Sequence, residues 1–233
     1  MLPQAGWAVP LGGRGGVRGG RSIAFRPMSE TVQFPSNGDS ASGYLARPAS
    51  GVGPGVLVLQ EWWGLVPQIK GVCDRLAGEG FTALAPDLFH GELAGHTEMD
   101  KASKLMMQLP ADRAARDMSA AVGFLCGHEA VGGDAVGVVG FCMGGGLALR
   151  IAAIEGSRIA AAVPYYGAPF DNPPDWSGLS APVLGHYAEN DAFFGPGPVK
   201  ELEAALQSMG KDVTLQVYPG TGHAFANEEN ALG

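Results

Sequence analysis

Short apolar runs alternate along the chain with segments in which apolar residues recur every three or four positions. Continuous apolar runs predict buried strands at 55–60, 81–85, 136–139, 159–165, 182–186 and 213–217. The wider spacing predicts helices at 69–80, 98–108, 111–127, 147–154 and 199–209. Two shorter strands, at 31–34 and 43–46, are expected to be joined by a turn over residues 38–42. This alternation favours an α/β fold, with a mostly parallel central sheet and helices on both faces.

The junction between the strand at 136–139 and the helix at 147–154 reads Gly140-Phe141-Cys142-Met143-Gly144. This pattern is typical of a nucleophile elbow, with Cys142 in the place usually taken by serine. The turn is tight, so the residues two before and two after must be small, and both are glycine. The amides that begin the helix would favour a thiolate. The alternative is that Cys142 is a small buried apolar residue in a glycine-rich turn, which many α/β proteins contain.

A thiol nucleophile needs a base, and the base needs an acid that orients it. Two late loops supply both in the expected order of acid and then histidine. Asp191 follows the strand at 182–186, and His223 follows the strand at 213–217. The rival acids are Asp171, Asp175 and Glu189, of which the first two lie in a proline-rich loop and are expected to be solvated turn residues.

An acyl-transfer site also needs backbone N–H groups that stabilise the negatively charged oxygen of the tetrahedral intermediate. One such donor comes from the residue after the nucleophile, and the other from the loop after an early strand, here the one at 55–60. These positions are Met143 and Trp62. The sequence therefore predicts an oxyanion hole formed by their two backbone amides.

Composition places the chain among ordinary globular proteins. Of 233 residues, 46% are hydrophobic and 16% are charged, which suits one domain with a sizeable core. The first 27 residues carry four arginines and no acid, which leaves 11 basic and 23 acidic side chains in the remainder. This acidic body argues against non-specific nucleic-acid binding. No apolar run is long enough to cross a bilayer, and three cysteines without paired spacing favour a reducing, cytoplasmic location.

Residues 1–27 differ from the rest, because glycine and arginine dominate positions 12–21. Three interpretations are open: an RNA-binding arginine–glycine segment, a targeting peptide, or an upstream extension before a true start at Met28. The last is favoured, because the patterned sequence begins at Met28. We expect the leader to be disordered and residues 28–233 to form a single domain.

Six short motifs together resemble the dienelactone hydrolase (carboxymethylenebutenolidase) family of the α/β-hydrolase superfamily. They are Gln60-Glu61-Trp62-Trp63-Gly64, Ala85-Pro86-Asp87-Leu88-Phe89, Gly140-Phe141-Cys142-Met143-Gly144-Gly145, Tyr165-Tyr166-Gly167, Asn190-Asp191 and Gly222-His223-Ala224-Phe225. The likeness extends from residue 30 to the C-terminus. It implies an α/β-hydrolase fold, a Cys–His–Asp triad and hydrolysis of a small cyclic enol ester to an oxo acid.

Position by position, the resemblance implies that Cys142 is the nucleophile, His223 the base and Asp191 the residue that orients it. It also implies that Glu61 is the family's carboxylate that contacts the resting thiol. A carboxylate beside the sulfur would disfavour the thiolate and protect it from oxidation until substrate binds. The alternative for Glu61 is a loop carboxylate that accepts hydrogen bonds from backbone amides.

The chain departs from the family at the two arginines that hold the substrate carboxylate. The corresponding segments, Phe89-His90-Gly91-Glu92 and Phe225-Ala226-Asn227, contain none. A carboxylate buried without a cation costs several kcal/mol, so dienelactone itself is expected to be a poor substrate. An apolar pocket is expected instead, formed by Trp62, Trp63, Phe89, Phe193 and Phe194. The sequence also stops ten residues after His223, so the family's C-terminal helix is expected to be missing.

These observations predict a monomeric, cysteine-dependent hydrolase of small esters or lactones. No metal or cofactor is expected, because the chain shows neither metal-ligand spacing nor a dinucleotide fingerprint. Neither a membrane nor a nucleic acid is an expected partner of the main domain. The alternatives are a general carboxylesterase or thioesterase with an apolar pocket, a catalytically silent binding protein of the same fold, and an RNA-associated protein acting through the leader.

Overall fold

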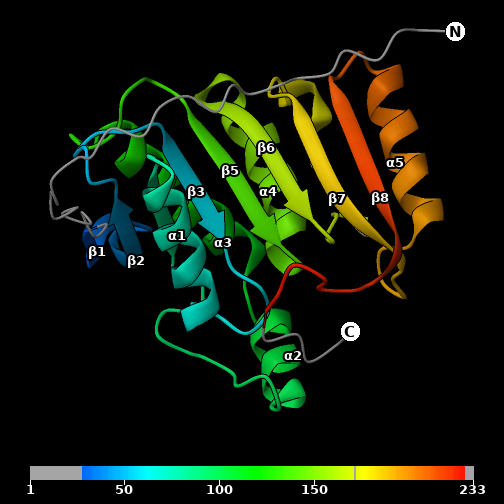
Figure 1. The fold of residues 1–233 in the computed structure, drawn as a ribbon, viewed down its shortest axis with the longest axis horizontal. Helices are drawn as coiled ribbons and strands as arrows, with labels where there is room; N and C mark the ends of the chain where they lie inside the picture. Colours follow the sequence, from blue (N-terminus) through cyan, green and yellow to red (C-terminus); the bar gives the residue numbers. More distant parts are fainter. Residues whose placement is uncertain (1–27, 171, 229–233) are drawn as a thin grey trace, which may run out of the picture.

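The computed structural model describes residues 28–170 and 172–228, in which eight strands form one sheet (Figure 1). The strands are β1 (Met28–Ser36), β2 (Asp39–Arg47), β3 (Gly55–Leu59), β4 (Thr82–Pro86), β5 (Val136–Phe141), β6 (Ile159–Tyr165), β7 (Val183–Asn190) and β8 (Val213–Gly222). The helices are α1 (Pro67–Gly78), α2 (Met99–Met107), α3 (Ala111–Cys126), α4 (Met143–Glu155) and α5 (Pro196–Ser208), with two short 3₁₀ turns. The predictions about the leader and the end of the chain concern residues outside these ranges.

The sheet has the order β1-β2-β4-β3-β5-β6-β7-β8. Strand β2 pairs antiparallel with both β1 and β4, and the remaining neighbours are parallel. The prediction of a mostly parallel sheet is therefore confirmed. The order reverses beside β3, whose partners β4 and β5 lie on opposite sides of it, and ligand sites of open α/β sheets form at such a reversal.

The first hairpin differs from the predicted turn at 38–42. Its connection is the pair Asn37-Gly38, whose φ angles are 55° and 76°. Asparagine and glycine adopt this left-handed conformation at low cost, and it matches the twist of a two-residue hairpin. Residues 39–42 therefore belong to β2, in register with β1.

Helices cover both faces of the sheet, as predicted. Helix α1 packs on one face through Ile69, Val72 and Cys73. Helices α3, α4 and α5 pack on the other face, where Met118, Leu149 and Leu206 lie in a second core. Figure 1 shows α1 in front of the strands and α3 and α4 behind them. No helix in the described parts of the chain is long and apolar enough to cross a membrane.

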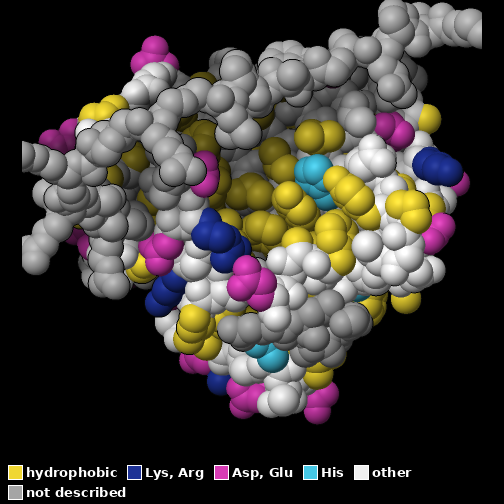
Figure 2. Space-filling view, in the orientation of Figure 1, with side chains coloured by type: hydrophobic (Ala, Val, Ile, Leu, Met, Phe, Trp, Pro, Cys, Tyr) yellow, Lys and Arg dark blue, Asp and Glu magenta, His cyan; other side chains and the backbone are white. Residues whose placement is uncertain are grey.

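Beside α1, the same face of the sheet carries a surface groove. It is lined by apolar side chains of α1, β3, β5 and β6, including Val139, Val163 and Tyr165. Figure 2 shows hydrophobic side chains gathered in the middle of this face. The groove reaches the carboxyl ends of β5 and β6, but Cys142, Asp191 and His223 are not among the residues that line it.

Candidate active site

Cys142 lies between the last residue of β5 and the first residue of α4, with φ of 53° and ψ of −117°. Residues other than glycine rarely adopt a positive φ, and such strain is concentrated at functional sites. Two backbone hydrogen bonds fix the turn: the Cys142 N–H donates to Tyr165 O at 3.0 Å, and Gly145 N–H donates to Cys142 O at 2.9 Å. The local geometry is therefore that of the predicted elbow.

Glycine is required around this turn because backbones approach closely. A Cβ on Gly140 would lie 2.0 Å from the carbonyl oxygen of Gly144, and one on Gly144 would lie 2.4 Å from that of Leu59. These contacts match the sequence prediction for both glycines. Gly167, which follows β6, is equally constrained, since its Cβ would lie 1.8 Å from the Cys142 carbonyl oxygen. That contact depends on the pairing of β5 with β6.

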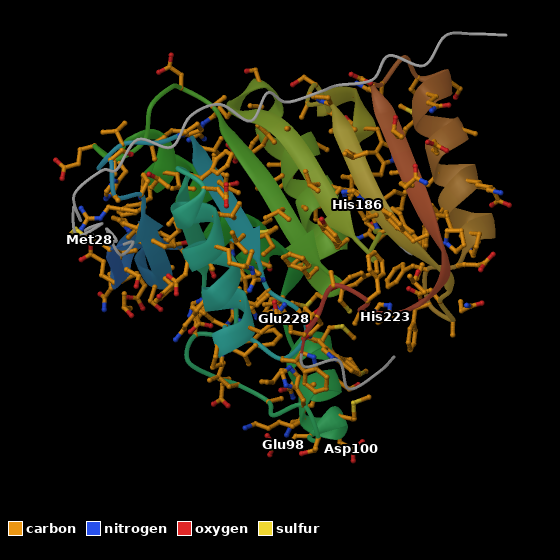
Figure 3. The ribbon with its side chains drawn as sticks, viewed as in Figure 1. Met28, Glu98, Asp100, His186, His223 and Glu228 are labelled. Carbon is orange, nitrogen blue, oxygen red and sulfur yellow. The ribbon has the colours of Figure 1, made fainter. Side chains whose placement is uncertain are left out.

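His223 directly follows β8 and Asp191 directly follows β7. The Nε2 atom of His223 lies 3.3 Å from Cys142 Sγ, and its Nδ1 atom lies 2.7 Å from Asp191 Oδ2. His223 is 6% exposed and Asp191 is 7% exposed, so the pair is shielded from water. Figure 3 shows His223 at the carboxyl ends of the strands, whereas His186 lies within β7. The three residues predicted as a triad are brought together.

The rival acids have other partners. Asp175 is exposed and accepts a hydrogen bond from Ser177 N–H at 2.9 Å. Glu189 is also exposed and accepts one from Gly220 N–H at 2.9 Å. Asp171 lies outside the described residues. Asp191, rather than Asp175 or Glu189, therefore pairs with the imidazole.

Asp191 is held in its ionised form. Burial alone would raise the pKa of its carboxyl group, but hydrogen bonds from His223 and from the backbone of Phe194 and Phe193 keep that pKa below its ordinary value. The two backbone N–H groups donate to Oδ1 at 3.0 and 2.8 Å, which leaves Oδ2 directed at the imidazole. An ionised carboxylate at Nδ1 favours the tautomer protonated there, so Nε2 can accept a proton from the thiol.

The surroundings of the Cys142 sulfur favour its thiol form. Burial, followed by the charge of Glu61, raises the pKa of Cys142 to about 12, with a smaller contribution from Asp191. The backbone N–H of Met143 acts in the opposite direction but does not outweigh them. The amide that begins α4 therefore acts in the expected direction, towards a thiolate, but desolvation and a neighbouring carboxylate outweigh it.

Glu61 is buried, with 1% of its surface exposed, and side chains from two distant loops hold it. The Tyr166 hydroxyl donates to Oε1 at 3.2 Å, and Asn227 Nδ2 donates to Oε2 at 2.6 Å. Burial raises the pKa of Glu61, while Asn227, Tyr166 and His223 oppose part of that rise. The sequence motifs contain Tyr166 but give no sign that it contacts Glu61, and they single out Asn227 only as a missing arginine.

A cavity of about 160 Å³ lies over Cys142 and His223. Trp62 and Met143, the two residues predicted to form the oxyanion hole, line it together with Phe193 and Phe194, as predicted for the pocket. Met143 is the first residue of α4, so its N–H has no carbonyl partner within the helix. The remaining lining residues are Met99 and Met106, which the sequence predictions did not include.

Two predicted pocket residues do not line this cavity. Trp63 is 3% exposed and packs edge-on against Trp62 and His96, with ring centroids 5.0 Å away in each case. Phe89 is 5% exposed and also lies in the interior. Composition alone could not separate them from the lining residues, because an aromatic side chain in a loop can equally fill a core.

The two segments that lack the family's arginines, 89–92 and 225–227, carry side chains that contact other residues of the chain. His90 Nε2 lies 2.8 Å from Asp117 Oδ2, and Asn227 contacts Glu61. The residues that line the cavity include no lysine or arginine. Within residues 28–170 and 172–228, no group of three or more His, Cys, Asp or Glu side chains could hold a metal ion. A substrate carboxylate would therefore meet no cation among the lining residues.

Comparisons with known proteins agree with the fold. The profile of the dienelactone hydrolase family matches residues 41–233. Protein usf of Aquifex pyrophilus is 38% identical over 208 residues, which cover 87% of this chain and 89% of that protein. An Aquifex aeolicus protein named "Putative carboxymethylenebutenolidase" is 36% identical, with the same coverage of 87% and 89%. The crystal structure of a "Putative Dienelactone Hydrolase" from Klebsiella pneumoniae gives a TM-score of 0.75 at 29% identity, covering 88% of this chain and 90% of that one.

Proposed function

Because the chain belongs to the dienelactone hydrolase family, we propose that it hydrolyses small, uncharged esters or lactones through an acyl-enzyme on Cys142. The observation that carries this proposal is the continuous path from Sγ to Nε2, at 3.3 Å, and from Nδ1 to Asp191, at 2.7 Å. The absence of lysine and arginine among the lining residues supports an uncharged substrate. The proposal therefore differs from hydrolysis of a carboxylated dienelactone.

In this mechanism, His223 Nε2 takes the thiol proton as the sulfur attacks the ester carbonyl carbon. The backbone N–H groups of Trp62 and Met143 stabilise the oxyanion that forms. The tetrahedral intermediate then collapses, the C–O bond breaks, and the alkoxide leaves with the proton from His223. A water molecule, deprotonated by the same imidazole, next attacks the thioester and releases the acid and the thiol.

Glu61 has a separate role in the proposal, which is to keep the resting sulfur protonated. Its charge is the second largest cause of the raised Cys142 pKa, after burial. A protonated sulfur is a poor target for oxidants, because oxidation follows thiolate character and exposure. Asn227 and Tyr166 hold the carboxylate in place through the contacts described above.

Replacing Asp191 with asparagine is expected to lower kcat/KM for p-nitrophenyl acetate by about 10²–10⁴-fold, because the imidazole loses its charged partner and its fixed tautomer. The matched control is Asp175→Asn, which alters a rival acid that accepts from Ser177 instead. That variant should retain the parental rate. Equal losses in both variants, or none in Asp191→Asn, would remove Asp191 from the triad.

Replacing Glu61 with glutamine is expected to accelerate alkylation of Cys142 by iodoacetamide at pH 8.5. A negative charge near the sulfur raises its pKa, so removing that charge lowers the pKa and increases the thiolate fraction. The thiolate fraction should rise about tenfold for each unit by which the pKa falls, and the rate about three- to fourfold, because a less basic thiolate is a weaker nucleophile. Glu189→Gln is the matched control, because that carboxylate accepts from Gly220. An unchanged or slower rate in Glu61→Gln would contradict the protective role.

We also propose that the protein works as a monomer in a reducing, cytoplasmic compartment. Cys142, His223 and Asp191 contact one another within one chain, so the proposed triad needs no residue from a second copy. Cys73, Cys126 and Cys142 are free in the structure, and a thiol nucleophile acts only while it is reduced. The four arginines of the leader are not part of this proposal.

A further inference from the structure

We propose that α2 selects the substrate: Met99 and Met106 form an adaptable wall that receives a flexible, uncharged acyl chain of several carbons. This inference rests on the proposed hydrolase function and adds the substrate class. The acyl group remains attached to Cys142 after the first step, and Cys142 itself lines the cavity. An acyl chain would therefore extend from the sulfur into the space between α2 and the loop that carries Phe193 and Phe194.

The spacing of the two methionines places them on one side of α2. They are seven residues apart, close to two turns of an α-helix, so both side chains can face the same cavity. Each methionine is 37% exposed, so neither side chain is buried in the hydrophobic core. Glu98 and Asp100, the acidic neighbours of Met99, do not line the cavity. The helix therefore presents sulfur-containing apolar groups to the site.

Helix α2 is attached to the rest of the molecule over a small area. Ala102 is the only one of its nine residues that is buried. Figure 1 shows the helix projecting beyond the carboxyl ends of the strands. Elements with few buried apolar groups are the ones that adjust position most readily. The part of the lining formed by α2 can therefore move more easily than the part formed by Phe193 and Phe194, whose backbone N–H groups donate to Asp191.

The side chains of these two parts of the lining also differ in flexibility, and α2 again supplies the more adaptable ones. Phenylalanine is rigid, whereas methionine is unbranched and polarizable, with three rotatable bonds that let it fill irregular space. A rigid wall near the imidazole and an adaptable wall on α2 suit ligands that share a reacting group and differ in their apolar tail. Such a site favours straight or branched aliphatic acyl groups over a single fixed ring.

The test is a series of p-nitrophenyl esters from acetate to octanoate. In Met99→Ala/Met106→Ala, the ratio of kcat/KM for hexanoate to that for acetate should fall about tenfold or more relative to the parent, because the longer chain loses its contacts. Met107→Ala is the matched control, since Met107 is 80% exposed on the same helix and does not line the cavity. An unchanged ratio in the double variant, or an equal fall in the control, would overturn the proposal.

A second measurement separates this inference from the proposed function. The rate at which Cys142 is alkylated by N-alkyl iodoacetamides, in which the sulfur displaces iodide, requires no ester turnover. The parent should react faster with N-hexyl than with N-methyl iodoacetamide, and the double variant should lose that preference while Met107→Ala keeps it. A protein that shows this pattern without hydrolysing esters would retain the α2 site and lose the hydrolase proposal. Equal reactivity with both reagents in the parent would overturn the α2 site itself.

Discussion

Replacing Cys142 with alanine is expected to lower the turnover of p-nitrophenyl acetate by about 10⁴-fold or more, to the rate of catalysis without a nucleophile. The reason is that the acyl-enzyme needs a sulfur at the elbow, 3.3 Å from the His223 Nε2 atom. Initial rates measure the loss, and the mass of the protein after brief exposure to the ester should show an acyl adduct only in the parent. This result would exclude a catalytically silent binding protein.

The matched control for this experiment is Cys126→Ala. Cys126 is the last residue of α3, is free and partly buried, and does not line the cavity. Its substitution should leave the rate unchanged and show that loss of a thiol alone has no effect. If Cys142→Ala retained the parental rate while folded, the esterase activity would have to arise elsewhere, and the triad would be abandoned.

The second large effect concerns stability. Gly144→Ala is expected to lower the free energy of unfolding by more than about 4 kcal/mol, or to prevent folding, since overlap with backbone cannot be relieved by turning a side chain. The new Cβ would lie 2.4 Å from Leu59 O and 2.6 Å from Gln60 O. Both oxygens belong to the chain at the end of β3, which carries Glu61 into the site. Urea denaturation followed by circular dichroism measures the change.

Gly71→Ala is the control for this substitution. Gly71 lies within α1, and its added Cβ would meet only the end of the Arg75 side chain, at 3.7 Å. Alanine has the higher helix propensity, so this variant should be neutral or more stable by up to about 1 kcal/mol. A loss in Gly144→Ala no larger than the change in Gly71→Ala would show that the elbow backbone is not as tightly packed as its contacts indicate.

The elbow and its partners could be predicted because their signals are local. Gly140 and Gly144 flank a reactive residue at a strand-to-helix junction, and both are required by short backbone contacts. Asp191 and His223 follow two strands whose apolar runs were evident, and parallel strands place their carboxyl ends along one edge. The hairpin at Asn37-Gly38 was also present in the sequence as a turn signal, but the predicted turn was placed after it.

The sequence by itself determined the fold class, the residues proposed for catalysis and the lack of arginine in the two segments where the resemblance implies one. These depend on periodicity, residue type and order along the chain. The tertiary structure alone decided that Asn227 and Tyr166 hold Glu61, that Trp63 and Phe89 face the interior, and that two methionines of α2 complete the cavity. The physical reason is that burial, and contact between distant segments, depend on how each helix and loop packs in the folded chain. Spacing within one segment carries no information about the side chain that another segment places opposite it.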